Sequence, residues 1–421
     1  MIIDSSNKQK GIYISFLIYP LWSLFLSLKY FRIPQAKNLF WLFCIFLGMI
    51  HIYFPEGAGG FDGARYAQRL IDLHQQPVSI ENFTDSFYED GEFVDIYQPV
   101  VTYLFSIVTD NPRWLFILFA IVFGFFYSRN LWFVLEKFPP TLGFSLILLT
   151  IFYALICPIW EINGVRMWTA FHVFLYGALP YIYVADKSKL VWCFVSLLIH
   201  FSYFLPLTIL LVYYFIPKSI NFLLAFYLIS SFIREIDLEI ISQFLSSFMP
   251  SFLTSRVTGY ANDDYAQFLN DLHSNLNFYV EGSYIFSKWI TTLMFVTMCT
   301  WGKKIVKAHK VLTNMICFSL FIYGIINILS LIPPVGRFFL LCQMFAFVSF
   351  ILFMIIYKNY AYKQRKIAAV FQYVPFLLIL PIIVKIRIGC DFYGISLLFN
   401  PLSVIFIDDN LPIIQFIKSI F

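Results

Sequence analysis

Residues 161–167 read EINGVRM and join two apolar runs, 141–160 and 168–184, each long enough to cross a bilayer. A carboxylate, an amide and a guanidinium therefore meet between two membrane segments, with almost no loop. An ionised side chain inside a membrane segment costs about 2.5–3.5 kcal/mol on insertion scales, so it is usually placed to bind something. Arg166 carries the fork of N–H donors that holds a phosphate. The alternative is an arginine whose charge snorkels to the membrane surface, with Glu161 as its salt-bridge partner.

The composition outside this stretch is that of a polytopic membrane protein. Of the 421 residues, 60% are hydrophobic and 13% charged, and the mean hydropathy is +0.77, whereas soluble proteins carry about 25% charged residues. The 52 Phe, 27 Tyr and 9 Trp predict a strongly aromatic lipid-facing and interfacial surface. We expect an all-α fold with about 11–13 transmembrane helices, forming a single transmembrane domain over residues 1–421. The net charge of +5 is small and indicates topology, not a nucleic-acid partner.

Two long polar segments interrupt the apolar runs, at 56–97 and 235–282. Two short loops, 302–310 and 358–366, are rich in Lys and Arg, and this bias predicts that they are cytoplasmic. Counting spans from these loops places both polar segments outside. Residues 56–97 are thus expected to form extracytoplasmic loop 1, and residues 235–282 extracytoplasmic loop 2.

The chain must then cross the membrane an even number of times between the two outer loops, and two arrangements satisfy this. In the first, 97–109 is a span and 189–216 is a single helix. In the second, 97–109 dips in without crossing, and 189–216 is a hairpin of short helices broken near His200–Ser202. Thirteen residues make about 20 Å of helix, short of the roughly 30 Å hydrocarbon core. The second arrangement, which we favour, also keeps several lysines inside: Lys137, Lys187, Lys189 and Lys218.

This topology brings separated polar groups to the outer face. Arg166 and His200 lie there, and so does Arg337, which follows the Pro333-Pro334 break between two late spans. Histidine at a membrane boundary can act as a general base, because its ordinary pKa is near neutral. The alternative for His200 is a helix-ending side chain bonded to a backbone carbonyl.

The outer loops hold further candidates. Asp62 with Tyr66, and Arg65 with Arg69, are spaced by four residues, so they form two adjacent rows on a helix; a solvated surface helix is the alternative. In the second loop, Arg256 precedes Tyr260 and several carboxylates and amides. Rings beside such groups suit sugar binding, although an ordinary interfacial aromatic loop has the same composition.

Several kinds of chemistry are disfavoured by the sequence. The seven cysteines form no C-x-x-C pair, and the histidines lack metal-ligand spacing, so we expect neither a disulfide framework nor a metal site. No Walker motif, H-E-x-x-H motif or nucleophile elbow is present, and we expect no cofactor. Any activity must draw its energy from an activated substrate or from a gradient.

The order of the short motifs resembles that of the EpsG/Wzy-type polysaccharide polymerases. The motifs are Gly60-x-Asp62 followed by Tyr66, then Asn163-Gly164-x-Arg166, then His200-Phe201-Ser202, and finally Gly336-Arg337. The resemblance covers residues 56–340. The chain differs in having Met167 where the family often has Gln, and Gln98-Pro99 where it often has an acidic residue before Pro.

The resemblance implies a multi-pass enzyme of the bacterial inner membrane, a glycosyltransferase that acts as a polymerase. It would join O-antigen or capsule repeat units carried on undecaprenyl pyrophosphate, alongside a flippase and a chain-length regulator. The departing pyrophosphate needs cations, which Arg166, Arg337, Arg65 and Arg256 would supply, with Asn163 and Tyr66 in the substrate site. His200, or in its place Asp62, would deprotonate the acceptor hydroxyl.

Three other functions fit parts of the same pattern. A glycosyltransferase using polyprenyl-phosphate sugars would share the outer-face groups but add single sugars. A flippase or transporter of lipid-linked oligosaccharide would carry charged residues through the whole membrane depth, and the predicted spans are nearly free of them. An acyltransferase acting at His200 would need a donor that is usually cytoplasmic.

Overall fold

The computed structural model describes residues 13–53, 62–89, 92–93, 95–140, 142–233, 277–330, 332–358, 365–407 and 411–420. Within these ranges the chain is almost entirely helical, which confirms the all-α expectation. The α-helices are α2 (Pro20–Lys29), α3 (Ala36–Met49), α4 (Asp62–His74), α5 (Ile80–Asp85), α6 (Tyr97–Ser106), α7 (Pro112–Leu135), α8 (Phe144–Ile156), α9 (Val165–Val184), α10 (Leu190–Ile199), α11 (Phe204–Tyr213), α12 (Ile220–Ser230), α16 (Phe278–Cys299), α17 (Lys303–Ala308), α18 (Lys310–Leu329), α19 (Phe339–Tyr357), α20 (Arg365–Tyr373), α21 (Ile379–Gly389), α22 (Pro401–Val404) and α23 (Ile413–Ile420).

Short 3-10 helices connect several of these elements: η1 (Ile159–Gly164), η2 (Lys187–Lys189), η3 (Phe201–Tyr203), η4 (Pro333–Phe338), η6 (Val374–Leu378) and η7 (Ile395–Leu398). One two-stranded antiparallel ribbon, β1 (Tyr88–Glu89) with β2 (Glu92–Phe93), lies just before α6. It is a small appendage of a helical fold.

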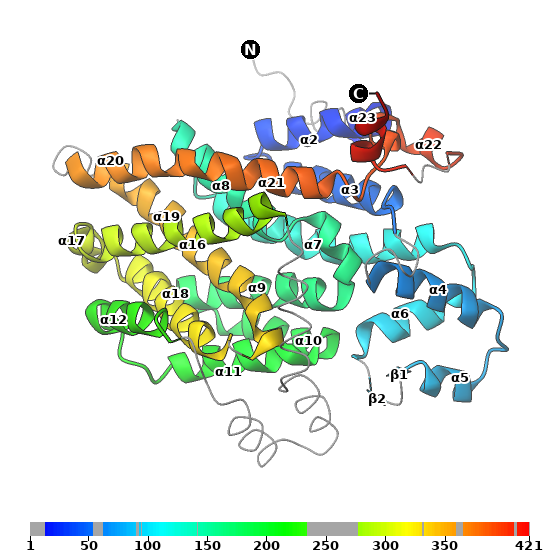
Figure 1. The fold of residues 1–421 in the computed structure, drawn as a ribbon, viewed down its shortest axis with the longest axis horizontal. Helices are drawn as coiled ribbons and strands as arrows, with labels where there is room; N and C mark the ends of the chain where they lie inside the picture. The colour runs from blue at the N-terminus through cyan, green and yellow to red at the C-terminus, as the bar shows by residue number, and fades with distance from the viewer. Residues whose placement is uncertain are drawn as a thin grey trace.

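Five helical segments of the described chain are long and apolar enough to cross a membrane: Pro112–Leu135, Phe144–Val184, Lys310–Leu329, Val335–Tyr357 and Lys366–Gly389. Shorter apolar helices, such as Ala36–Met49, accompany them. The longer helices run along the long axis of the molecule, with α4, α5 and α6 gathered at one end and α17 at the other (Figure 1). The polytopic membrane fold is thus confirmed, and it has two distinct ends.

Helices α7 and α9 run side by side in the same direction. The ring centroids of Phe126 and Tyr176 are 5.4 Å apart, and seven residues further along both helices those of Phe133 and Tyr183 are also 5.4 Å apart. The 20 residues of α9 give it a length of about 30 Å, the thickness of a hydrocarbon core. Its first turn carries Arg166, and its last turn lies at the opposite end of the bundle.

The segment from Lys189 to Ile216 forms a hairpin, as the second arrangement requires. α10 ends at His200, whose backbone is extended (φ −154°, ψ 116°), and α11 begins after one turn of 3-10 helix. α10 lies antiparallel to α9, close enough that a Cβ on Gly177 would be 2.7 Å from the Lys189 carbonyl oxygen. α11 then returns to the starting end, where the Tyr213 hydroxyl donates to Asn314 Oδ1 (3.0 Å) and Asn314 donates to the Ile182 carbonyl (2.6 Å).

The other short element, α6, also fits that arrangement. Its ten residues reach about 15 Å, half of a hydrocarbon core. α6 packs against α4 at the same end of the bundle as the hairpin tip (Figure 1). Two short elements, α6 and the hairpin, therefore approach the first turn of α9.

Candidate functional site

The EINGVRM stretch folds as η1 followed directly by the first turn of α9. Asn163 is 9% exposed, and no hydrogen bond to its Oδ1 atom is formed within the part of the chain that the structure describes. Helix α4 passes directly over this amide, because a Cβ on Gly63 would lie 2.2 Å from Asn163 Oδ1. The EINGVRM stretch is therefore a packed junction that contacts the start of α4.

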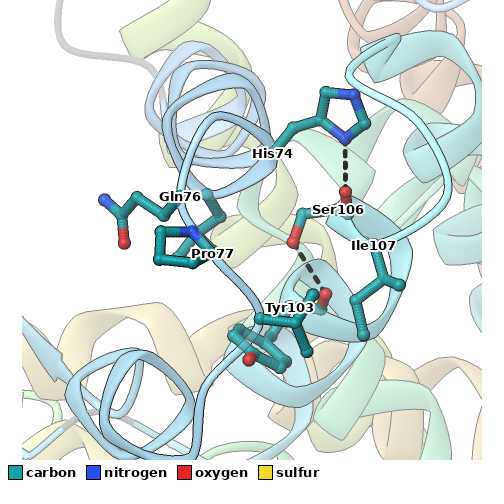
Figure 2. A pocket seen from close by; sticks show the side chains of 8 residues that line it. His74, Gln76, Pro77, Tyr103, Ser106 and Ile107 are labelled. Carbon is teal, nitrogen blue, oxygen red and sulfur yellow. Dashed lines mark hydrogen bonds between the residues drawn. The ribbon is translucent and has the colours of Figure 1, made fainter.

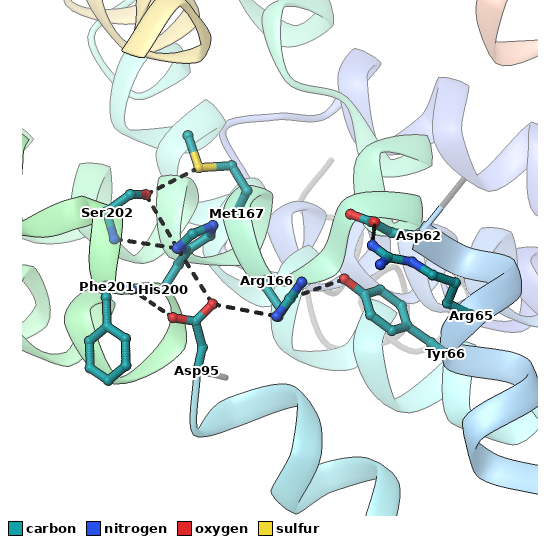
Figure 3. A network of polar contacts seen from close by, with 9 residues as sticks. All are labelled: Asp62, Arg65, Tyr66, Asp95, Arg166, Met167, His200, Phe201 and Ser202. Atoms are coloured by element: carbon teal, nitrogen blue, oxygen red, sulfur yellow. Dashed lines mark hydrogen bonds and ion pairs between the residues drawn. The ribbon is translucent and has the colours of Figure 1, made fainter. Parts of the chain in front are cut away.

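Arg166 connects α4 to the chain that precedes α6. Its Nε atom donates a 3.3 Å hydrogen bond to the Tyr66 hydroxyl, and its Nη1 atom lies 3.9 Å from Asp95 Oδ2 (Figure 3). The side chain of Arg166 is 18% exposed. A guanidinium has five N–H donors in a planar fork, a geometry that suits the oxygens of a phosphate.

Asp95 is the centre of the network, and sequence reasoning missed it. Its side chain is 1% exposed and faces three groups: the Arg166 guanidinium, the backbone N–H of Phe201, which donates to Oδ1 (2.9 Å), and His200 Nδ1, 3.5 Å from Oδ2. A buried carboxylate needs such charge and hydrogen-bond compensation. The one available signal was its position, as the last carboxylate before the apolar run that begins at Tyr97.

His200 lies at the tip of the hairpin with one ring nitrogen directed into the network. Its Nδ1 atom is 3.4 Å from the backbone N–H of Ser202 and 3.3 Å from the Ser202 hydroxyl, besides its contact with Asp95. The Ser202 hydroxyl also lies 3.7 Å from the Met167 sulfur (Figure 3). His200 does end a helix, as the alternative interpretation stated, but a buried carboxylate faces its ring.

The first turns of α4 carry the two predicted rows, and Asp62 pairs from one row to the other with Arg65, one turn away. Tyr66 is 4% exposed and turned inward to Arg166, while Arg69 donates to the backbone carbonyls of Ser86 and Tyr88. The solvated-helix alternative is therefore wrong for the face that carries Tyr66. Burial raises the pKa of the Tyr66 phenol well above its usual range, so this residue is a neutral hydroxyl and not a base.

Of the two remaining predicted cations, only Arg337 lies in the described part of the chain. Arg337 is exposed on η4, and the neighbouring Phe338 ring lies 5.5 Å from the Tyr203 ring, at the hairpin tip. Arg337 is thus at the same end of the bundle as His200, but no hydrogen bond or ion pair of the described residues joins it to Arg166. Arg256 lies outside the described residues.

The expected pairing of Arg166 with Glu161 is wrong. Glu161 forms no ion pair with Arg166; the carboxylate beside the guanidinium is Asp95. Glu161 instead interacts electrostatically with Lys385 of α21. The carboxylate closest to Arg166 in the preceding sequence is therefore not the one that pairs with it.

A small cavity of about 70 Å³ separates the end of α4 from α6 (Figure 2). His74 Nδ1 faces the Ser106 carbonyl across it, and the Tyr103 hydroxyl donates to the Ser79 carbonyl (2.8 Å). Ligand sites are usually several hundred Å³. We therefore treat this cavity as a packing gap that these bonds close, and not as a sugar site.

One family model matches the chain: the EpsG family, over residues 80–397, which is most of its length. No curated protein and no solved structure matches. The matched region contains Asp95, Arg166, His200 and Arg337, whereas α4 with Asp62, Arg65 and Tyr66 precedes it.

Proposed function

The chain belongs to the EpsG family of polysaccharide-biosynthesis membrane proteins, and from this we propose that it polymerises lipid-linked oligosaccharide repeat units. The substrate would be carried on undecaprenyl pyrophosphate, and the product would be a surface polysaccharide such as O-antigen or capsule. The reaction would take place at the outer face of a bacterial inner membrane.

The observation that carries the proposal is the position of Asp95 between Arg166 and His200. Repeat-unit transfer forms a bond between an acceptor hydroxyl oxygen and the anomeric carbon of the donor sugar. The bond from that carbon to the pyrophosphate breaks, and its electron pair leaves with the polyprenyl pyrophosphate. The reaction thus needs a base for the acceptor proton and a cation for the departing charge, both in one place.

The network supplies these two functions from neighbouring elements. His200 would take the acceptor proton, and Asp95 beside its ring would stabilise the cation that forms. Arg166 would hold the pyrophosphate, aided by Arg337 and Arg65 on the same end of the bundle. Tyr66, a buried neutral hydroxyl bonded to Arg166, would fix the guanidinium. Asn163 would offer its amide beside α4, Asp62 is the competing base, and Arg256 would add a further cation.

The distribution of lysines supports an outer location for the site. At the far end of α9, Lys137 lies over the Tyr183 ring (4.7 Å), Lys189 over the Tyr176 ring (5.0 Å) and Lys218 over the Tyr213 ring (5.3 Å). Helix α17 and its lysines lie at that end too. Because Lys and Arg accumulate on the cytoplasmic side of membrane proteins, the Arg166 end would face outward.

The test is polymerisation in proteoliposomes that contain the purified full chain and lipid-linked repeat units extracted from the native host. We expect a ladder of glycan lengths with the wild type, and loss of the ladder with Arg337→Gln. This exposed arginine can be changed without disturbing the buried network. Arg32→Gln, an exposed arginine at the lysine-rich end, is the matched control and should keep the ladder.

The products separate the rival functions. A product longer by one sugar would identify a single-sugar transferase, and movement of intact substrate across the bilayer without bond formation would identify a flippase. Either result, or a full ladder with Arg337→Gln, would contradict the proposed roles.

A further inference from the structure

A second cavity, of about 190 Å³, lies between α3, α7 and α9, toward the lysine-rich end of the bundle. It is separate from the network around Asp95, because its lining comes from the last turns of α7 and the second half of α9. The lining residues are Lys37, Arg129, Asn130, Trp132, Phe133, Glu136, Tyr176, Leu179 and Pro180.

Arg129 is the unusual member of this lining, because it is a cation within a membrane-spanning helix. It lies six residues before the end of α7, roughly 9 Å along the helix axis. Its guanidinium donates to Asn38 Oδ1 (2.7 Å) and Ser128 Oγ (2.8 Å), both neutral groups. Within the described residues no carboxylate is at ion-pair distance from it. Ionisable side chains at such positions are rare and mark functional sites by default.

Aromatic rings hold the Arg129 guanidinium in place. Its central carbon lies 4.0 Å from the Phe125 ring centroid and 5.1 Å from that of Trp41. These contacts and the bond to Asn38, in the first turn of α3, fix the position of the guanidinium. Cation–π contacts orient a cation without neutralising it, so its attraction for an anion is retained.

Other cations surround the same cavity. Lys37 lines it and lies 3.8 Å from Glu136, the one acidic residue in the lining. Lys137 lies 3.6 Å from the centroid of the Phe133 ring and Lys189 lies 5.0 Å from that of Tyr176, and both rings line the cavity. Positive groups therefore outnumber negative ones, and the site is suited to a small anion.

We propose that this cavity binds the phosphate of an anionic phospholipid headgroup from the leaflet at the lysine-rich end. A volume of 190 Å³ is below that of typical pockets for drug-sized ligands, which excludes a nucleotide sugar. Basic pockets between membrane helices on the cytoplasmic side are a known setting for anionic lipid headgroups. A bound phosphate would pair with Arg129 and Lys37 and hold α3, α7 and α9 together.

The experiment is native mass spectrometry of the purified full chain in non-ionic detergent, titrated with phosphatidylglycerol or with phosphatidylcholine. We expect the wild type to retain phosphatidylglycerol in preference. Arg129→Gln should weaken that binding about tenfold or more, because a charge-assisted hydrogen bond is lost. Lys187→Gln removes an exposed lysine at the same end and should bind as the wild type does.

Two further experiments make the result decisive. In the first, inorganic phosphate is added in place of lipid, and thermal unfolding is measured. If phosphate protects the chain as well as phosphatidylglycerol does, the ligand is a soluble anion and the lipid proposal is overturned. In the second, Lys37→Gln, at the rim of the cavity, replaces Arg129→Gln if that variant fails to fold. Unchanged phosphatidylglycerol binding in the variant that folds would also overturn the proposal.

Discussion

A carboxylate oxygen of Asp95 lies 3.5 Å from His200 Nδ1, although the helices α7, α8 and α9 separate the two residues in the chain. Asp95 precedes the short helix α6, and His200 is the tip of the α10–α11 hairpin. Neither element crosses the bundle. The contact therefore joins two elements that end beside the first turn of α9, where Arg166 completes the network (Figure 3).

The first prediction concerns Asp95→Asn. The amide keeps an acceptor for the Phe201 N–H but removes the charge beside His200 and Arg166, so polymer formation in proteoliposomes should fall at least about tenfold. Asp95→Glu, which keeps the charge, should restore part of the activity. Asp72→Asn, an exposed carboxylate on α4, serves as the control and should be fully active. Equal activity of Asp95→Asn and wild type would exclude a positioning role.

Arg166→Lys separates charge from geometry. The lysine still compensates the buried Asp95 carboxylate, so the protein should remain folded, but it lacks the planar fork for pyrophosphate, so most polymerisation should be lost. Arg166→Ala leaves Asp95 uncompensated and should destabilise the fold by about 3 kcal/mol or more. Thermal unfolding in detergent measures the second effect and the glycan ladder measures the first. Full activity of a folded Arg166→Lys chain would argue against bidentate binding.

Gly63→Ala tests the packing of α4 on the EINGVRM stretch. The new Cβ would lie 2.2 Å from Asn163 Oδ1, so α4 or the amide must shift, at a cost of about 1–3 kcal/mol. We expect lower thermal stability and reduced polymer. A second change, Asn163→Ala, should relieve the steric clash and recover stability. Gly143→Ala, whose Cβ meets nothing within 4 Å, is the control, and a similar loss there would remove the packing explanation.

The hairpin makes a prediction about membrane sidedness. Ser188 and Ser219 are exposed and lie before and after the hairpin. If both lie on the cytoplasmic side, Ser188→Cys and Ser219→Cys should both be protected from a membrane-impermeant maleimide added outside intact cells. Gln76→Cys, between α4 and α5, should react. The Cys390→Ser background is suitable, because the other described cysteines are buried. Labelling of one serine position but not the other would show that 189–216 crosses as a single helix.

Much of the fold could be predicted from the sequence because a helix must have a minimum length to cross the hydrocarbon core. A thirteen-residue apolar run is too short to cross, and the polar His200–Ser202 break inside an apolar run predicts a turn. The same counting predicted that Arg166, His200 and Arg337 lie at one membrane surface. Contacts between side chains did not follow from it, since counting fixes which end a residue reaches and not which residue it touches.

Asp95 shows why the rest could not be predicted. It stands among many acidic residues in a polar segment without helical periodicity, and its partners belong to α9 and η3, far along the chain. Arg129 was missed for a different reason. It is a single cation in a long apolar run, and the sequence around it contains no sign of a partner. Only the packing of α3 against α7 shows that Asn38 and two rings hold it.

The short hairpin has a consequence for the lipid around the protein. The first arm of the hairpin, Leu190–Ile199, rises about 15 Å, against roughly 30 Å of hydrocarbon. Apolar side chains of the hairpin, among them Val191, Phe194, Leu198 and Phe204, are exposed and face outward. Such hydrophobic mismatch is relieved by thinning of the bilayer. The membrane surface beside His200 should therefore lie closer to the bilayer midplane. A carrier lipid that diffuses laterally to this place would present its pyrophosphate at the depth of Arg166, while its chain stays in the membrane.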